Sequence, residues 1–105
     1  MTRSDDERIA DILEAADQIA LLVGRGREAF DTDVAVRFAV ERLLEIVGEA
    51  ANAMSEGARD ARPGVGWRDI TRLRVVLAHH YHRVDPNQVW AIATTEVPRL
   101  AQALG

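Results

Sequence analysis

The residues best suited to chemistry lie in one short stretch, RVVLAHHY at residues 74–81. The surrounding segment, 67–84, holds all three histidines and the only tyrosine of the 105-residue chain. Arginine stays charged and can direct two donors at a phosphate, whereas histidine titrates near neutral pH and can act as a base and then as an acid. Arg74 and His79 therefore match the needs of metal-free RNA cleavage, a base for the 2′-hydroxyl and a cation for the charge on the phosphoryl oxygens.

Helical geometry limits how these residues can cooperate. At 100° per residue, Arg74 and Tyr81 lie about 20° apart on one helix face. Arg74 and His79 differ by about 140° around the axis and by about 7.5 Å of rise. One straight helix does not bring Arg74 and His79 onto a single phosphate. The spacing therefore predicts either a helix that distorts around residues 78–80 or a site where two copies of the motif meet.

Ordinary structural roles stay open for the same residues. Histidines at a helix end commonly compensate the helix dipole, and a tyrosine on a core stripe can be buried with its hydroxyl at the rim. His79 and His82 have a spacing that could bind a metal, but no third ligand has an evident place. We therefore expect neither a metal site nor a cofactor.

Positive charge concentrates around the motif, although the chain carries a net charge of −4. Residues 1–58 carry six arginines against thirteen acidic residues, a net of −7, and residues 84–105 carry −1. Residues 59–83 carry six arginines against two acidic residues, a net of +4. Because a nucleic-acid-binding domain is normally basic overall, we expect a local anion site rather than a surface that is basic throughout.

Capping signals and apolar periodicity predict the first helices. Ser4 and Glu7 have the spacing of a capping box ahead of an apolar stripe at three- and four-residue intervals. Gly24 is expected to end this helix with positive φ, followed by a solvated turn at residues 25–27. Asp33 is expected to cap a second helix that runs without proline to Glu56, about six turns.

The remaining helices carry and follow the motif. Residues 59–66 are predicted as a loop, and the motif helix is expected to begin near Trp67. Asp85 and Pro86 have the residue types of an N-cap and a first helical position, so they predict a last helix. Pro98 removes one hydrogen bond from that helix and is expected to kink it.

These elements predict an all-α fold, with one domain over residues 1–105. Four main amphipathic helices with short connections favour an antiparallel up-and-down bundle, with room for a short extra helix. The absence of cysteine, the acidic start of the chain and the lack of a long apolar run predict a cytoplasmic protein with no membrane contact. Phe38, Leu44 and Trp90 lie partly off the apolar stripes, which favours a partner helix or a homodimer.

Further features surround the motif in a set order. They are FAVERLLEIVGEAA at residues 38–51, Trp67-Arg68-Asp69-Ile70, the Arg-x4-His-x-Tyr pattern at residues 74–81, and Val97-Pro98-Arg99-Leu100. With these features the chain resembles the HEPN superfamily and, within it, the HepT family of toxins that pair with minimal nucleotidyltransferase (MntA-type) antitoxins.

The resemblance implies a dimeric, helical, metal-independent endoribonuclease that is toxic when free. Arg74 and His79 would be its catalytic pair, and Tyr81 would be the residue whose hydroxyl receives AMP from the antitoxin. RNA and the cognate nucleotidyltransferase are the implied partners. A homodimer and a larger hetero-oligomer with the antitoxin are the implied assemblies.

Two positions depart from the family pattern. Val75 stands where members commonly have a polar residue, and His80 where many have a small one. His80 could substitute for His79 or compete with it, and Arg72, with six residues between it and His79, is an auxiliary candidate. Val75 also keeps a second hypothesis open, a non-catalytic helical module that binds a nucleotide or the nucleotidyltransferase.

Overall fold

The computed structural model describes residues 4–79 and 84–105, without the side chain of His79. All regular structure in these ranges is helical, which confirms the all-α prediction. None of the helices described there is long and apolar enough to cross a membrane. The elements are α1 (Asp5–Val23), α2 (Arg27–Thr32), α3 (Val34–Ala53), α4 (Glu56–Asp60), α5 (Trp67–His79), α6 (Pro86–Ala91), the π-helical segment η2 (Ile92–Glu96) and α7 (Val97–Leu104).

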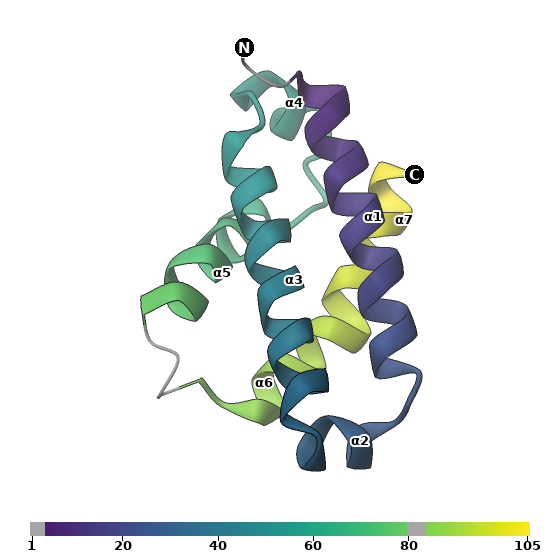
Figure 1. Ribbon diagram of the computed structural model, residues 1–105. Coiled ribbons are helices and arrows are strands. Elements are labelled where there is room, and N and C mark those ends of the chain that lie inside the picture. Colours follow the sequence, from purple (N-terminus) through teal and green to yellow (C-terminus); the bar gives the residue numbers. More distant parts are fainter. Residues whose placement is uncertain (1–3, 80–83) are drawn as a thin grey trace.

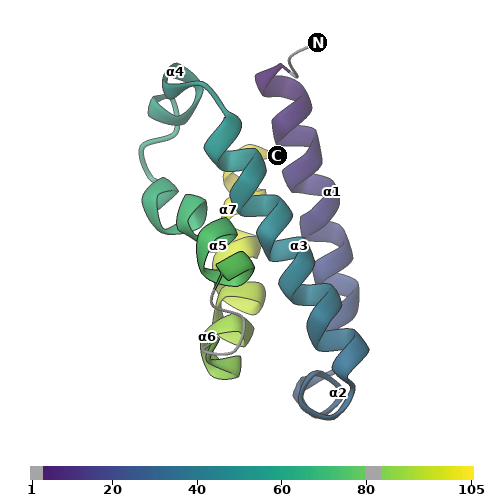
Figure 2. The ribbon, with the colours of Figure 1, turned by 60° about the vertical axis from the view of Figure 1, so that its left-hand side comes forward.

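The four main helical rods alternate in direction, as an up-and-down bundle requires (Figure 1). α3 is central, because it packs extensively against α1 on one side and against α5 on the other. The α6–η2–α7 rod runs behind α3 and packs on α1 through η2 and α7 (Figure 2). The short helices α2 and α4 lie at opposite ends of the bundle.

The core is built from the apolar stripes that the periodicity predicts. Of the three apolar residues expected at the edges of these stripes, only Phe38 is exposed, at 60%. Leu44 is fully buried, and Trp90 is half-buried with its ring centroid 5.3 Å from that of Phe30. The largest fully buried side chains are Phe30, Ile12, Ile19, Leu44, Val40 and Val47.

The α1–α2 connection differs from the prediction. The capping box of Ser4 and Glu7 is present, but Gly24 has a φ of −61° and continues the right-handed turn. The chain reverses at Gly26 instead, whose φ of 96° and ψ of 162° lie in a region open almost only to glycine. Residues 25–27 are not simply a solvated turn, because Arg27 begins α2 and its guanidinium lies over the rings of Phe30 and Trp90.

The long third element also ends earlier than expected. Asp33 caps α3 by accepting a hydrogen bond from the backbone N–H of Ala35. The helix stops at Ala53 rather than at Glu56, because Ser55 caps the separate short helix α4. The predicted loop at 59–66 therefore begins inside the last turn of α4.

The predicted effect of Pro98 is a kink, and the structure shows a change of helix type just before this proline. Asp85 caps α6 as expected, with Pro86 at its start. Pro98 has no N–H, and its ring would collide with the carbonyl of Thr94 in a regular α-helix. The chain responds with the π-helical segment η2, in which the N–H of Val97 bonds to the carbonyl of Ile92, five residues earlier.

Candidate functional site

The helix that carries the motif touches α3 backbone to backbone at Gly48. A Cβ atom added at Gly48 would lie 2.9 Å from the backbone nitrogen of Arg74 and 2.9 Å from the carbonyl oxygen of Ile70. A side chain at this position therefore requires α5 to move away from α3. The contact holds the backbone of Arg74 in place, while its side chain remains exposed.

The two ends of α5 are anchored by different interactions. At the start, the Trp67 indole N–H donates to the carbonyl oxygens of Arg59 and Arg62, at 2.9 and 3.1 Å. Toward the other end, Leu77 is buried in the core. These contacts orient the helix so that its other faces are available for ligands.

The arginines of α5 have no carboxylate partner in the part of the chain that the structure describes. Arg68, Arg72 and Arg74 are all exposed, and none of them forms a salt bridge within residues 4–79 and 84–105. Asp69 is the one acidic residue of this helix. Arg68 and Arg72 lie on one side of α5 and Arg74 lies about 160° around the axis from Arg72, so two sides of this helix offer cations to an anion such as a phosphate.

The α-helix continues regularly through His79, so the predicted distortion does not lie at residue 78 or at the backbone of His79. In this register, Arg74 and His79 remain about 140° apart. Arg72 and His79 are seven residues apart and lie about 20° from each other. His80, Tyr81 and His82 lie outside the described residues, so the predicted proximity of Arg74 and Tyr81 stays a prediction.

Arg72 belongs to an exposed row along α5. Arg68, Arg72 and Val75 follow one another at intervals of four and three residues, the spacing of one helix face. His79 is the next residue in that register. Val75, the departure from the family pattern, is 41% exposed, so this row is cationic with an apolar break between Arg72 and His79.

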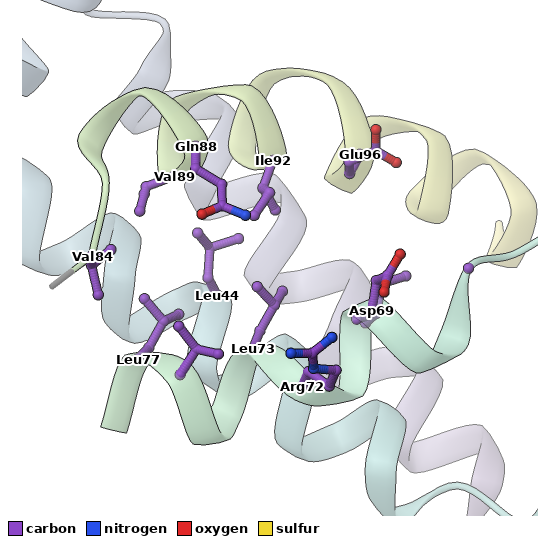
Figure 3. A pocket seen from close by; sticks show the side chains of 13 residues that line it. Leu44, Asp69, Arg72, Leu73, Leu77, Val84, Gln88, Val89, Ile92 and Glu96 are labelled. Atoms are coloured by element: carbon purple, nitrogen blue, oxygen red, sulfur yellow. The ribbon is translucent and has the colours of Figure 1, made fainter. Parts of the chain in front are cut away.

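A groove of about 490 Å³ lies beside this row, between α5 and the α6–η2 rod. Leu44 of α3 forms its floor, and Leu73, Leu77, Val89 and Ile92 form its apolar walls (Figure 3). Polar side chains stand at its ends and edge. Asp69 directs its carboxylate into the gap below Glu96, the amide of Gln88 enters from α6, and Arg72 lies at the edge of α5 (Figure 3).

Sequence reasoning missed this groove. Gln88 and Glu96 occupy the polar positions of an ordinary amphipathic helix, and Asp69 can be read as a favourable acid in the first turn of α5. Only the tertiary arrangement that places α5 beside the α6–η2 segment brings them together. Within the described ranges, no cluster of three or more His, Asp or Glu side chains is arranged to hold a metal ion.

Comparison with known proteins identifies related chains. The sequence profile of a family described as "Ribonuclease HepT-like" matches residues 12–105. "Probable ribonuclease HepT" of Thermococcus cleftensis is 34% identical, over 95% of this chain and 92% of its own. "Putative RNase MJ1380" of Methanocaldococcus jannaschii is 35% identical, over 86% of this chain and 84% of its own. No solved structure matches the chain.

Proposed function

The chain belongs to the HepT-like ribonuclease family, and we propose that it is a metal-independent endoribonuclease in which Arg74 and His79 cleave RNA. The observation that carries this proposal is the state of Arg74. Its backbone is held against α3 at Gly48, and its exposed guanidinium has no salt-bridge partner among the described residues. A cation that is fixed at its base and free at its tip can bind a phosphate without first breaking an ion pair.

The chemistry needs one base, one acid and one cation. His79 takes the proton of a 2′-hydroxyl, and the 2′-oxygen forms a bond to the adjacent phosphorus. The bond from phosphorus to the 5′-oxygen breaks, and protonated His79 then acts as the acid and returns a proton to that oxygen. The products are a 2′,3′-cyclic phosphate and a 5′-hydroxyl. Arg74 stabilises the charge on the phosphoryl oxygens, with no cofactor, and Arg72 and His80 are auxiliary candidates.

Two copies of the chain form the site. Arg74 and His79 are about 140° apart on a regular α5, so an Arg74 and a His79 from different chains can approach one phosphate more easily than a pair from one chain. Exposed apolar side chains, Val75 and Val76 on α5 and Phe38 on α3, offer surface for a homodimer.

The biological setting that we propose is a cytoplasmic toxin–antitoxin pair. The antitoxin, a minimal nucleotidyltransferase, transfers AMP from ATP to the hydroxyl of Tyr81, forming an oxygen–phosphorus bond and releasing pyrophosphate. An AMP phosphate near Arg74 would occupy the cation and exclude RNA. The toxin dimer and antitoxin assemble into a larger hetero-oligomer.

RNA cleavage in EDTA tests the enzymatic part of this proposal. We expect the wild-type protein to leave 2′,3′-cyclic phosphate ends in EDTA, and Arg74→Ala to lose about 10²–10³-fold in rate. Arg25→Ala, which removes an exposed arginine of the α1–α2 turn, is the matched control. Binding of RNA without cleavage would favour the non-catalytic module, and cleavage that stops in EDTA would indicate a metal-dependent enzyme.

Mass spectrometry tests the regulatory part separately. Co-expression with the partner nucleotidyltransferase should raise the intact mass by one or more AMP units. Tyr81→Phe should abolish the increase, because it removes the acceptor oxygen and little else. An unshifted wild-type mass beside an active partner would contradict the assignment of Tyr81.

A further inference from the structure

The groove between α5 and the α6–η2 rod has a shape and a charge pattern that the cleavage chemistry does not use. We propose that it binds a guanine base of the RNA and makes cleavage selective for sites next to a guanine. This inference rests on the proposed ribonuclease function. It adds a substrate preference, set by Asp69 and Gln88 rather than by the catalytic pair.

The groove is suited to a flat ring. Its volume of about 490 Å³ falls in the range of small-molecule sites. Its walls, Leu73 and Leu77 on α5 and Val89 and Ile92 opposite, are apolar, and Leu44 closes the floor (Figure 3). Single-stranded RNA is recognised mainly through unstacked bases that enter such pockets and bond through their edges.

The polar ends of the groove select among the bases. Asp69 has no hydrogen-bond or salt-bridge partner within the described residues, and its carboxylate enters the gap (Figure 3). An ionised carboxylate is only an acceptor and can receive two parallel donors. Guanine alone presents two adjacent donors, N1–H and the exocyclic amine, on one edge. Adenine, cytosine and uracil each place an acceptor beside their donor on that edge, which a carboxylate repels.

The opposite end of the groove complements the other side of guanine. The amide of Gln88 enters from α6 (Figure 3), and an amide N–H can donate to the ring nitrogen N7. Glu96, the second acid near Asp69, lies 3.8 Å from Arg99 and is 56% exposed. We therefore assign the main contact to Asp69.

The position of the groove connects the base to the reacting phosphate. Arg72 lines the groove and also belongs to the exposed row of Arg68, Arg72 and Val75 on α5. An RNA backbone that follows this row keeps its phosphates on the arginines, while one base turns into the groove. That path leads toward His79, the next residue in the register.

Binding of nucleoside 3′-monophosphates tests the pocket without depending on catalysis. NMR titration should show 3′-GMP binding roughly tenfold more tightly than 3′-AMP, 3′-CMP or 3′-UMP, as expected for hydrogen bonds to a charged group. Asp69→Asn should remove that preference, because the NH₂ group of the asparagine amide would face one of the two N–H donors of guanine. Gln88→Leu should weaken 3′-GMP binding several-fold. Asp60→Asn is the matched control, because it makes the same carboxylate-to-amide change at an exposed residue at the end of α4. This variant should keep the preference for 3′-GMP.

Cleavage mapping separates this inference from the proposed function. Cleavage of a mixed-sequence RNA next to guanines, with the preference lost in Asp69→Asn, supports both. Cleavage without base preference, together with equal binding of the four nucleotides, overturns the guanine pocket and leaves the ribonuclease in place. Selective binding of 3′-GMP without RNA cleavage would support the guanine pocket and contradict the proposed ribonuclease activity. If the NMR signals of the groove residues shift with protein concentration but not with added nucleotide, the groove is an interface between protein chains and the inference is overturned.

Discussion

The backbone nitrogen of Arg74 lies directly over Gly48, so close that a methyl group on Gly48 would come within 2.9 Å of it. The added group would also meet the carbonyl oxygen of Ile70 at 2.9 Å and the Cβ of Leu73 at 3.1 Å. Two of these three atoms belong to the backbone, which cannot swing aside as a side-chain tip can. The proposed phosphate-binding arginine is therefore positioned by the smallest residue of α3.

Gly48→Ala should destabilise the protein even though alanine is the better helix former. The helix-propensity gain is about 1 kcal/mol, but displacing α5 is an overpacking cost of about 1–3 kcal/mol and disturbs the Arg74 position. We expect a lower unfolding midpoint and weaker RNA cleavage. Gly57→Ala is the control, because that glycine lies in α4 with open space around it; it should be neutral or stabilising. Equal stability of the two variants would contradict the contact.

Mixing two inactive variants should restore RNA cleavage if the site is shared between chains. Arg74→Ala and His79→Ala homodimers each lack one catalytic group. In a mixed dimer, one of the two shared sites pairs an intact Arg74 with an intact His79 from the other chain. We expect RNA cleavage to return when the two variants are mixed and exchange subunits. The cleavage rate, measured as a function of the mixing ratio, tests this. Activity that never rises above that of the separate variants would place both groups of a site in one chain.

Arg27→Ala should loosen the attachment of α2 to the last rod. The Arg27 guanidinium lies 5.8 Å from the Phe30 ring and 5.7 Å from the Trp90 ring, and it donates to Asp31 and Asn87 at 2.8 and 2.7 Å. From the usual worth of cation–π and surface contacts, we expect a loss of about 1–2 kcal/mol in the free energy of unfolding.

Arg42→Ala is the control for that loss. Arg42 forms an ion pair with Glu45 at 3.1 Å but its side chain is 61% exposed, so its removal should cost less than about 1 kcal/mol. Urea unfolding of both variants, followed by tryptophan fluorescence, measures the difference. A cost for Arg42→Ala as large as that for Arg27→Ala would argue against a special role for the aromatic contact.

Asp5→Ala should reduce stability in a way that depends on pH. The backbone N–H and the hydroxyl of Ser55 donate to the Asp5 carboxylate at 2.8 and 2.7 Å, and they lower the pKa of Asp5 from its usual value of 3.8. Because the folded-state pKa is the lower one, the contribution is fully present above pH 3.8 and is lost as the pH falls through the folded-state pKa. The stability gap to wild type should therefore close in acid.

Thermal unfolding between neutral pH and strongly acidic pH measures that gap. Asp17→Ala is the control, since Asp17 is an exposed residue of α1 with no hydrogen bond or salt bridge in the described part of the chain. The prediction fails if the gap for Asp5→Ala is independent of pH, or if it follows the same course as the gap for Asp17→Ala.

The local parts of the fold could be predicted from the sequence. The caps at Ser4, Asp33 and Asp85 are all present, because a side chain and the N–H groups two or three residues later suffice to form them. The start of the motif helix at Trp67 and the family also followed from short patterns. The exposure of Arg72 and Arg74 is consistent with the predicted anion site, although their roles stay predictions.

The sequence by itself determined the helical class, the apolar stripes and the residue types available for chemistry, since these depend on interactions within a few residues. Tertiary structure alone decided that the chain reverses at Gly26 rather than at Gly24. It likewise decided that Arg74 is the residue whose backbone packs against Gly48. It also decided that Asp69 and Gln88 line one groove. The physical reason is that each of these features is set by atoms far apart in the chain, through backbone approach and side-chain volume, which leave no local pattern to read.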